Sequence, residues 1–216
     1  EGGCGACTIV LGELKNSKIL YKSINSCITF VPALNGKQLI LIENLMSESG
    51  KLHSVQNAMV NFHGSQCGFC TPGFVMSMFA MFKNNKIIDN ELINDSLSGN
   101  LCRCTGYRPI IDAAQSLNNL SRYDHFDKDK FSIIKLLKKI KKKNIEITSK
   151  NKKYFAPKTI KDLKKILNKF KDANLLNGGT DLSLEVTKKR KELEKIIYLG
   201  SIEELSFIKK HKNEIE

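Results

Sequence analysis

The run Gly64-Ser65-Gln66-Cys67-Gly68-Phe69-Cys70-Thr71-Pro72-Gly73-Phe74 decides the fold of the central part of this chain. Two cysteines enclose Gly68-Phe69, and Thr71-Pro72 follows at once. Threonine is a favourable helix cap, and proline is well tolerated in the first helical turn. The run therefore predicts two thiol ligands at the start of a helix, of which one face carries Phe74, Met78, Phe79 and Phe82.

A second pair of cysteines, in Cys102-Arg103-Cys104, follows after a gap of 31 residues and precedes another helix start at Pro109. The positive amino ends of both helices would then face an anionic metal cluster. Inert buried cysteines do not explain this spacing. Spacing alone leaves a structural zinc site open, because zinc sites also use C-x2-C pairs. The candidate ligands of this second site are Cys67, Cys70, Cys102 and Cys104.

A first set of cysteines comprises Cys4 and Cys7, which enclose Gly5-Ala6, and Cys27. A [2Fe–2S] cluster needs four thiolates, and the plant-type spacing is C-x4-C-x2-C…C. Cys4 and Cys7 supply the C-x2-C part, so we expect one further ligand to precede Glu1 in a longer chain. The small residues beside these ligands let the backbone wrap closely around a cluster.

Composition and charge narrow the function classes. Seven cysteines in short-range sets, with no signal peptide at Glu1, favour metal ligation in a reducing compartment, so we expect a cytoplasmic protein. No apolar run approaches the roughly 20 residues that a membrane helix needs, and no membrane association is expected. The net charge of +13 comes mostly from lysines without interleaved aromatic residues. We therefore expect solvated lysines rather than a nucleic-acid site.

Hydrophobic periodicity predicts an α+β multidomain chain. Short strand-like runs separated by turn residues come first, and about four helices follow, one of them near 90–97. A lysine-rich, weakly patterned segment is predicted to be a linker. An α+β domain then begins, with a helix near 159–170 and a strand near 195–199. The predicted boundaries are 1–46, 47–122, 123–152 and 153–216.

The stretch Leu175-Leu176-Asn177-Gly178-Gly179-Thr180-Asp181-Leu182 lies in this last domain. It could be only a turn between a helix and a strand. Its chemistry suits a pyrophosphate, because two glycines permit close backbone approach and Thr180 adds a hydroxyl donor. It lacks the G-x-G-x-x-G of a Rossmann site and is not that motif.

Three long stretches resemble the signatures of the molybdenum hydroxylase family. They are Glu1-Gly2-Gly3-Cys4-Gly5-Ala6-Cys7-Thr8, the run 64–74 quoted above, and Gly99-Asn100-Leu101-Cys102-Arg103-Cys104-Thr105-Gly106-Tyr107-Arg108-Pro109-Ile110. The order of two clusters and then flavin is similar to xanthine dehydrogenase. The resemblance is best to the small iron–sulphur and flavin subunit of bacterial two-subunit xanthine dehydrogenases, although a single-chain enzyme stays open.

The resemblance implies a β-grasp ferredoxin domain, a four-helix-bundle domain with a second [2Fe–2S] cluster, and the start of a flavin domain. Residues Leu175, Leu176, Asn177, Gly178, Gly179, Thr180, Asp181 and Leu182 resemble the first FAD-binding loop of that domain, with Asn177 as a departure from the small or aliphatic residue expected. The resemblance also implies that Gln66 and Cys104 lie at the edge facing molybdopterin.

The activity that the resemblance implies is electron transfer during purine hydroxylation. Electrons would pass from a molybdopterin centre on a large partner subunit through two [2Fe–2S] clusters to FAD and then to NAD, with no catalytic residue on this chain. Another molybdenum hydroxylase, acting on aldehydes or N-heterocycles, is the enzymatic alternative. A zinc-bound scaffold is the non-enzymatic one.

Overall fold

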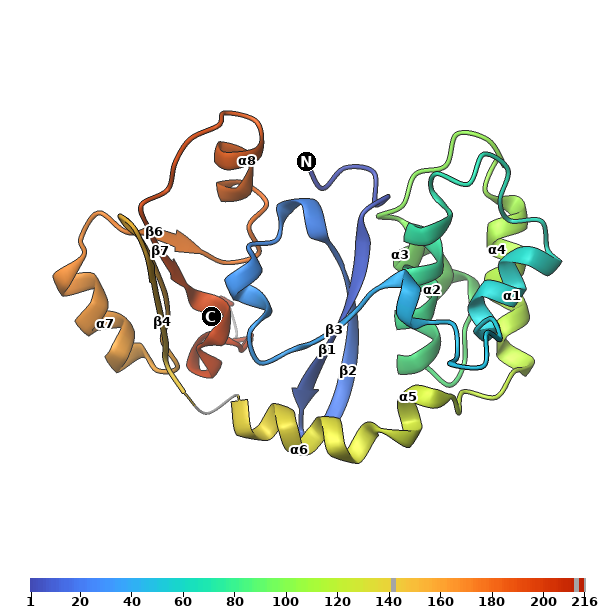
Figure 1. Cartoon of the computed structure of the whole chain (residues 1–216), viewed down its shortest axis with the longest axis horizontal. Coiled ribbons are helices and arrows are strands. Elements are labelled where there is room, and N and C mark those ends of the chain that lie inside the picture. The colour runs from blue at the N-terminus through green and yellow to red at the C-terminus, as the bar shows by residue number, and fades with distance from the viewer. Residues whose placement is uncertain (141–142, 212–213, 216) are drawn as a thin grey trace. The chain divides into compact units, whose positions relative to one another are not determined.

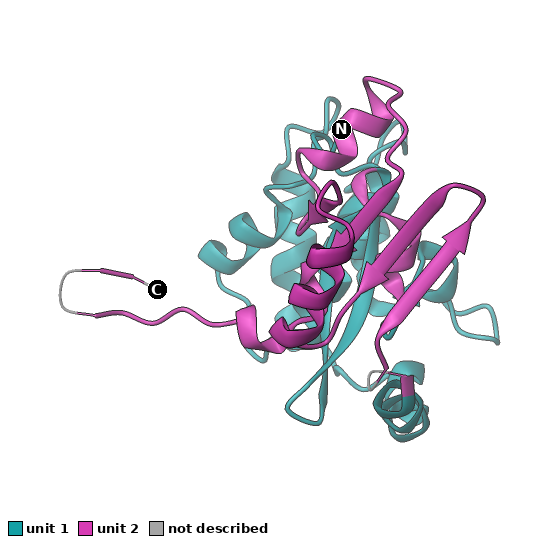
Figure 2. Cartoon of the chain, turned by 90° about the vertical axis from the view of Figure 1, so that its left-hand side faces the viewer, with its two compact units in different colours: residues 1–27, 36–139 teal, residues 28–35, 140–216 magenta. Residues whose placement is uncertain are grey.

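The computed structural model describes residues 1–140, 143–211 and 214–215, and the chain divides into two compact units (Figures 1 and 2). Unit 1 comprises residues 1–27 and 36–139, and unit 2 comprises 28–35 and 140–216. Residues 141 and 142 of the predicted linker, and 212, 213 and 216 of the predicted last domain, lie outside the described residues.

Unit 1 begins with a three-stranded antiparallel sheet in the order β2-β1-β3. A hairpin joins the first two strands, and its turn residues Asn16 and Ser17 have φ values of 47° and 62°. Positive φ at both positions is the geometry of a two-residue hairpin turn, which asparagine tolerates well. This turn is one of those that the sequence predicts between the first strand-like runs. The strands are β1 (Thr8–Lys15), β2 (Lys18–Asn25) and β3 (Gln38–Ile40).

Four helices complete the centre of unit 1, and each packs against two others: α1 against α2 and α4, and α3 against α2 and α4. The α-helix predicted at 90–97 is observed with these bounds, because Asp89 caps it by accepting a hydrogen bond of 2.8 Å from the amide of Leu92. The bounds are α1 (Ser54–Asn61), α2 (Thr71–Asn84), α3 (Asn90–Leu97) and α4 (Arg108–Ser116).

Helix α2 is the centre of the core, and it differs from the one-faced helix that the sequence predicts. Every residue from Gly73 to Phe82 is buried. The physical reason is that two strands, β1 and β2, and two helices, α1 and α3, all pack against α2. Figure 1 shows α2 between the sheet and α1. The ring of Tyr21 on β2 meets the ring of Phe79 edge-on at 5.6 Å. The sheet and the helices, predicted as domains 1–46 and 47–122, therefore share one hydrophobic core.

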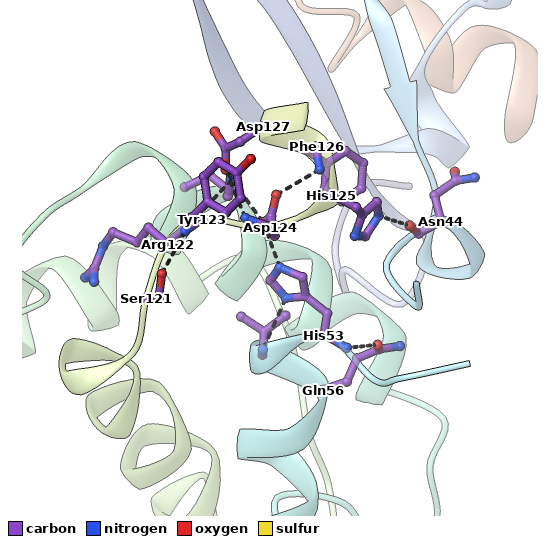
Figure 3. A network of polar contacts seen from close by, with 12 residues as sticks. Asn44, His53, Gln56, Ser121, Arg122, Tyr123, Asp124, His125, Phe126 and Asp127 are labelled. Carbon is purple, nitrogen blue, oxygen red and sulfur yellow. Dashed lines mark hydrogen bonds and ion pairs between the residues drawn. The ribbon is translucent and has the colours of Figure 1, made fainter. Parts of the chain in front are cut away.

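The segment predicted to be a linker, 123–152, is largely folded, which corrects that expectation. It contains α5 (His125–Lys128), α6 (Lys130–Ile140) and β4 (Ile145–Ser149). Asp124, which caps α5, binds the buried His53 at the start of α1 (Figure 3). Lys83 on α2 binds both Asp124 and Asp127. Phe126 and Leu137 are buried. These tertiary contacts supply the order that the lysine-rich pattern does not reveal.

Unit 2 contains a four-stranded sheet in the order β4-β5-β7-β6. The hairpin β4–β5 is antiparallel, whereas β5, β7 and β6 run parallel, with helices in the crossover connections. Phe30, from the early segment 28–35, packs against the hydrophobic core of this unit. The remaining bounds are β5 (Lys152–Ala156), α7 (Ile160–Lys169), β6 (Asn174–Leu176), α8 (Leu182–Thr187) and β7 (Lys195–Tyr198).

Short 3-10 helices connect several of these elements, at Ser26–Ile28, Val31–Leu34, Ile42–Asn44, Leu117–Asn119, Leu199–Ser201 and Glu203–Leu205. Among the helices formed by the described residues, none combines the length and the apolar character that a bilayer crossing needs.

Candidate functional site: two groups of thiols and a glycine turn

The four cysteines of the second site lie in two loops that unit 1 brings together across the gap in the sequence. One loop precedes α2 and the other precedes α4. A side-chain hydrogen bond joins Cys67 to Cys104, and another joins Cys70 to Cys102. Each thiol of one loop thus meets a thiol of the other, so that the four side chains form two cross-loop pairs.

The loop before α2 is shaped by Gly68, whose φ is 86°. Cys70, rather than Thr71, occupies the cap position of the helix, and no side chain caps it. The sequence predicts Thr71 as the cap. Its hydroxyl instead forms a hydrogen bond of 2.6 Å with the hydroxyl of Ser65, which closes the loop around the two cysteines. Pro72 stands in the first turn of α2 as predicted.

The loop before α4 is held by Thr105 and Tyr107. The Thr105 hydroxyl lies 3.2 Å from the sulphur of Cys102 and also accepts a hydrogen bond from the amide of Tyr107. The Tyr107 hydroxyl accepts a hydrogen bond of 3.0 Å from the amide of Cys102. Tyr107 adopts a left-handed conformation, with φ of 69°, at the cap of α4. This loop therefore has a defined shape that presents both of its thiols.

The four thiols have different surroundings, which shift their pKa values in different directions. The amide of Phe69 lowers the pKa of Cys67, whereas burial raises the pKa of Cys70 to about 11. Burial acts to raise the pKa of Cys102, but hydrogen bonds from Thr105 and from the Cys104 amide outweigh it and bring that pKa to about 7. The hydrogen bond with Cys67 raises the pKa of Cys104. The pKa values of Cys67 and Cys102 thus lie below that of an ordinary cysteine thiol, and cysteine binds metal as the thiolate.

The first group of thiols lies where the β1–β2 hairpin brings its two ends together. Thr8 pairs with Asn25, so Cys7 and Cys27 become neighbours and share a side-chain hydrogen bond. Burial acts to raise the pKa of Cys27, but the hydrogen bonds from Cys7 and from the amide of Gly2, at 3.4 Å, lower it overall. Cys4 is exposed in the same loop as Cys7.

One backbone contact connects the two groups of thiols. The amide of Leu101 donates a hydrogen bond of 2.9 Å to the carbonyl of Cys4. Leu101 directly precedes Cys102, and Cys4 belongs to the first group. The two thiol-bearing loops therefore touch within unit 1 although their cysteines form separate groups.

The donor chemistry fits [2Fe–2S] clusters. Among the described residues, no three His, Cys, Asp or Glu side chains gather around a single-ion position. The thiols of the second site lie instead in pairs, and four cysteine thiolates hold a [2Fe–2S] cluster, two on each iron. Room is present beside them, because a Cβ added to Gly68 would meet no atom within 4 Å. Cys67, Cys70, Cys102 and Cys104 would thus hold one cluster, and Cys4, Cys7 and Cys27 would contribute to another.

The glycine turn at residues 175–182 lies in unit 2 between β6 and α8. It therefore connects a strand to a helix, whereas the sequence analysis considered a turn between a helix and a strand. Leu175 and Leu176 belong to β6, and Leu182 is the first residue of α8. Gly178 and Gly179 have φ values of 69° and 86°, which side chains disfavour. Ser183 anchors the turn by donating a hydrogen bond of 2.6 Å to the carbonyl of Ile28. Gly178 and Thr180 are exposed, so a ligand could approach their backbone.

Gln66 is exposed in the loop before α2, next to the exposed Cys67, and Cys104 is exposed on the other loop. The prediction that both face molybdopterin stays a prediction. Sequence reasoning assigned no role to Asn100 or Gly73, although both belong to the quoted signatures. Their significance lies in contacts between loops, for which a single sequence carries no local signal.

Two segments match known families. Residues 41–115 match a family described as "[2Fe-2S] binding domain", and residues 145–216 match one described as "FAD binding domain in molybdopterin dehydrogenase". The second match begins inside the predicted linker, at the start of β4.

The chain is similar to named enzymes, and one of the alignments covers its whole length. Xanthine dehydrogenase of Emericella nidulans is 31% identical over 262 residues, which cover 100% of this chain and 19% of that protein. Xanthine dehydrogenase of Blastobotrys adeninivorans is 50% identical over 55% of this chain and 8% of that protein, and aldehyde oxidase 1 of Oryctolagus cuniculus is 46% identical over 52% and 8%. The chain thus spans a fifth or less of the length of these relatives.

A solved structure, quinoline 2-oxidoreductase from Pseudomonas putida 86, is 29% identical and aligns over 64% of this chain and 72% of its own, with a TM-score of 0.46.

Proposed function

Because the chain belongs to the molybdenum hydroxylase family, we propose that it relays electrons from a molybdopterin centre to FAD and from there to NAD. The observation that carries this proposal is the arrangement of the thiols in unit 1. The two cross-loop pairs would form one ligand set, and Cys4 of the second set lies in a loop that contacts the loop of Cys102. Each bound [2Fe–2S] cluster would accept and release one electron at a time.

The backbone between the two sets offers a short covalent and hydrogen-bonded connection. From Cys102 it runs through the peptide to the amide of Leu101, across 2.9 Å to the carbonyl of Cys4, and into the first ligand set. The exposed Cys104 and Gln66 would lie toward the molybdopterin region, which resides on a partner subunit or elsewhere in the same polypeptide. The second cluster would then take electrons first, and the first would pass them toward the flavin.

The glycine turn would receive the FAD pyrophosphate. Gly178 is exposed and has a positive φ, so no Cβ hinders the approach of a ligand to its backbone, and the exposed Thr180 adds a hydroxyl. Gly179 is buried, and its amide donates a hydrogen bond of 2.7 Å to the carbonyl of Asn177, which holds the shape of the turn. Leu176 is buried beneath the turn at 2% exposure and fixes its position at the end of β6.

For the substrate we favour a purine such as hypoxanthine or xanthine, since xanthine dehydrogenases are among the relatives that align over the whole chain. The second candidate for the substrate is an aldehyde, because other relatives are named aldehyde oxidases. Substrate choice would be made at the molybdenum centre. The compartment that we propose is the cytoplasm, where all seven cysteines, free in this structure, would stay reduced.

The test is to purify the complete protein anaerobically and to measure iron, acid-labile sulphide, flavin and the visible spectrum. We expect about four iron atoms per chain, two for each [2Fe–2S] cluster, together with one FAD. Turnover of xanthine with NAD, compared with turnover of an aldehyde with oxygen, separates the two substrate classes. Stoichiometric zinc with a colourless protein would reject the electron-relay function.

A further inference from the structure

The side chain of Asn100 lies at the junction of the two thiol-bearing loops. It is 4% exposed, and its amide nitrogen donates hydrogen bonds of 3.1 Å to the carbonyl of Gly5 and 3.2 Å to the hydroxyl of Thr8. Its amide oxygen accepts a hydrogen bond of 2.6 Å from Ser77 on α2. One buried side chain therefore connects the first loop, the second loop and the helix that follows Cys70.

The hydrogen bonds around Asn100 run in one direction, which explains why an amide is needed. The Thr8 hydroxyl donates to the carbonyl of Gly5 at 2.6 Å, so it accepts from Asn100. Ser77 donates to Asn100, which in turn donates to Thr8 and Gly5. An aspartate would direct a carboxylate at the Gly5 carbonyl, which is an acceptor only. An aliphatic residue would leave these buried polar groups without hydrogen-bond partners, which is unfavourable.

The packing around this side chain leaves no free space. A Cβ added to Gly5 would overlap the carbonyl oxygen of Gly99 and lie 2.5 Å from the Asn100 amide nitrogen. A Cβ added to Gly73 would overlap the Gly5 carbonyl oxygen and lie 2.8 Å from the same nitrogen. Two glycines from distant parts of the sequence thus let three backbone segments close around one amide. The separation of the two loops is set at this point.

We propose that Asn100 is a positioning residue that fixes the separation and relative orientation of the two [2Fe–2S] sites, and so the rate at which an electron passes between them. This inference rests on the proposed function. Asn100 precedes Leu101, whose amide binds the Cys4 carbonyl, so holding its side chain to Gly5 and Thr8 keeps that contact closed. Electron tunnelling and magnetic coupling both fall steeply with distance, and both therefore report the role of Asn100.

The test uses the complete protein with Asn100→Ala and a matched control, Asn118→Ala. Asn118 also makes two amide hydrogen bonds within unit 1, of 2.9 and 2.7 Å, to the backbone of Ile88, but it contacts neither thiol loop. The readout is the low-temperature electron paramagnetic resonance spectrum of the fully reduced protein, in which two reduced clusters split each other's signals. The rate of electron passage between them is followed by rapid-freeze sampling.

We expect Asn100→Ala to keep both clusters, to change the splitting, and to slow inter-cluster transfer by roughly tenfold, which corresponds to about 1.4 kcal/mol of barrier. Asn118→Ala should lower the thermal midpoint but leave the splitting as in the wild type. Unchanged splitting and rate in an Asn100→Ala protein with full iron content would overturn the proposal.

Two milder variants cover the case in which Asn100→Ala fails to assemble. Ser77→Ala and Thr8→Val each remove one partner hydroxyl and should shift the splitting in a smaller degree, whereas wild-type splitting in both would overturn the proposal. Failure of the proposed function looks different, because a wild-type protein without iron would show no cluster signal at all.

Discussion

His53 donates a hydrogen bond of 2.9 Å from Nε2 to Oδ2 of Asp124, a residue 71 positions further along the chain (Figure 3). The direction follows from the other ring nitrogen, since Nδ1 accepts a hydrogen bond of 3.3 Å from the amide of Val55 and caps α1. The imidazole of His53 therefore caps α1 through one ring nitrogen and binds Asp124, the residue that caps α5, through the other.

The Asp124 contact makes stability depend on pH. Burial acts to raise the pKa of Asp124, but hydrogen bonds from His53 and Lys83 outweigh it and lower that pKa from the usual 3.8 to about 2. Because the folded pKa is depressed, this stabilisation is present above about pH 4 and is lost as the pH falls toward 2.

Replacing Asp124 by asparagine should therefore destabilise the protein by about 1.5–3 kcal/mol at pH 7, the range for hydrogen bonds to charged groups. The difference in the free energy of unfolding between this variant and the wild type should become smaller below about pH 4. Urea unfolding followed by circular dichroism between about pH 2 and pH 7 measures this difference over the range in which Asp124 becomes protonated. A difference that stays constant over the whole range would contradict the charge-based account.

Replacing Cys104 by serine tests the assignment of the second cluster. The change removes one thiol of the Cys67–Cys104 pair, so the second cluster should be lost or altered in its paramagnetic resonance signal while the first cluster and FAD remain. Purine-dependent reduction of NAD should fall steeply. Oxidation of NADH by an artificial acceptor should survive, because that path needs only the flavin. Equal loss of both activities in a folded, FAD-loaded protein would refute the proposed order of electron transfer.

Because Gly73 lies very close to the first loop, we expect alanine to be less favourable than glycine at this helical position, the reverse of the usual order. In a helix interior, alanine is favoured over glycine by about 1 kcal/mol. At Gly73, however, a Cβ would overlap the Gly5 carbonyl oxygen, so Gly73→Ala should destabilise by roughly 1–3 kcal/mol through overpacking. Gly99→Ala is the matched control, since a Cβ there meets nothing within 4 Å. Thermal unfolding compares the stability of the two variants. A Gly73→Ala protein as stable as Gly99→Ala would show that the predicted clash does not occur.

The glycine turn predicts a flavin-specific loss. Thr180→Ala removes an exposed hydroxyl beside Gly178 and Gly179, and we expect the dissociation constant for FAD to rise about tenfold, as the loss of a hydrogen bond to a charged group implies. Iron content should not change. Thr148→Ala, at an exposed position on β4, is the control. Titration of each flavin-depleted variant of the complete protein with FAD gives its dissociation constant. If Thr180→Ala binds FAD as tightly as Thr148→Ala does, Thr180 does not contact the flavin.

Much of this protein was determined by short-range pattern. The cysteine spacings, the prolines at the starts of α2 and α4, and the cap before α3 act over a few residues, so their consequences can be read from one sequence. The same is true of the Asn16-Ser17 turn. Family signatures around the cysteines then predicted two iron–sulphur sites and a flavin segment. The family matches confirm a [2Fe–2S]-binding domain at residues 41–115 and a flavin-binding domain at residues 145–216, and the first iron–sulphur site stays a prediction.

The tertiary structure alone decided which distant residues meet. It paired Cys67 with Cys104 and Cys70 with Cys102, and it assigned residues 28–35 to unit 2. It also folded most of the predicted linker, through Asp124 and its partners, and buried α2 on every side. Asn100 shows the reason most clearly: a polar residue between two loops has no periodicity to reveal it, because its role arises only when packing brings three separate backbone segments within hydrogen-bonding distance.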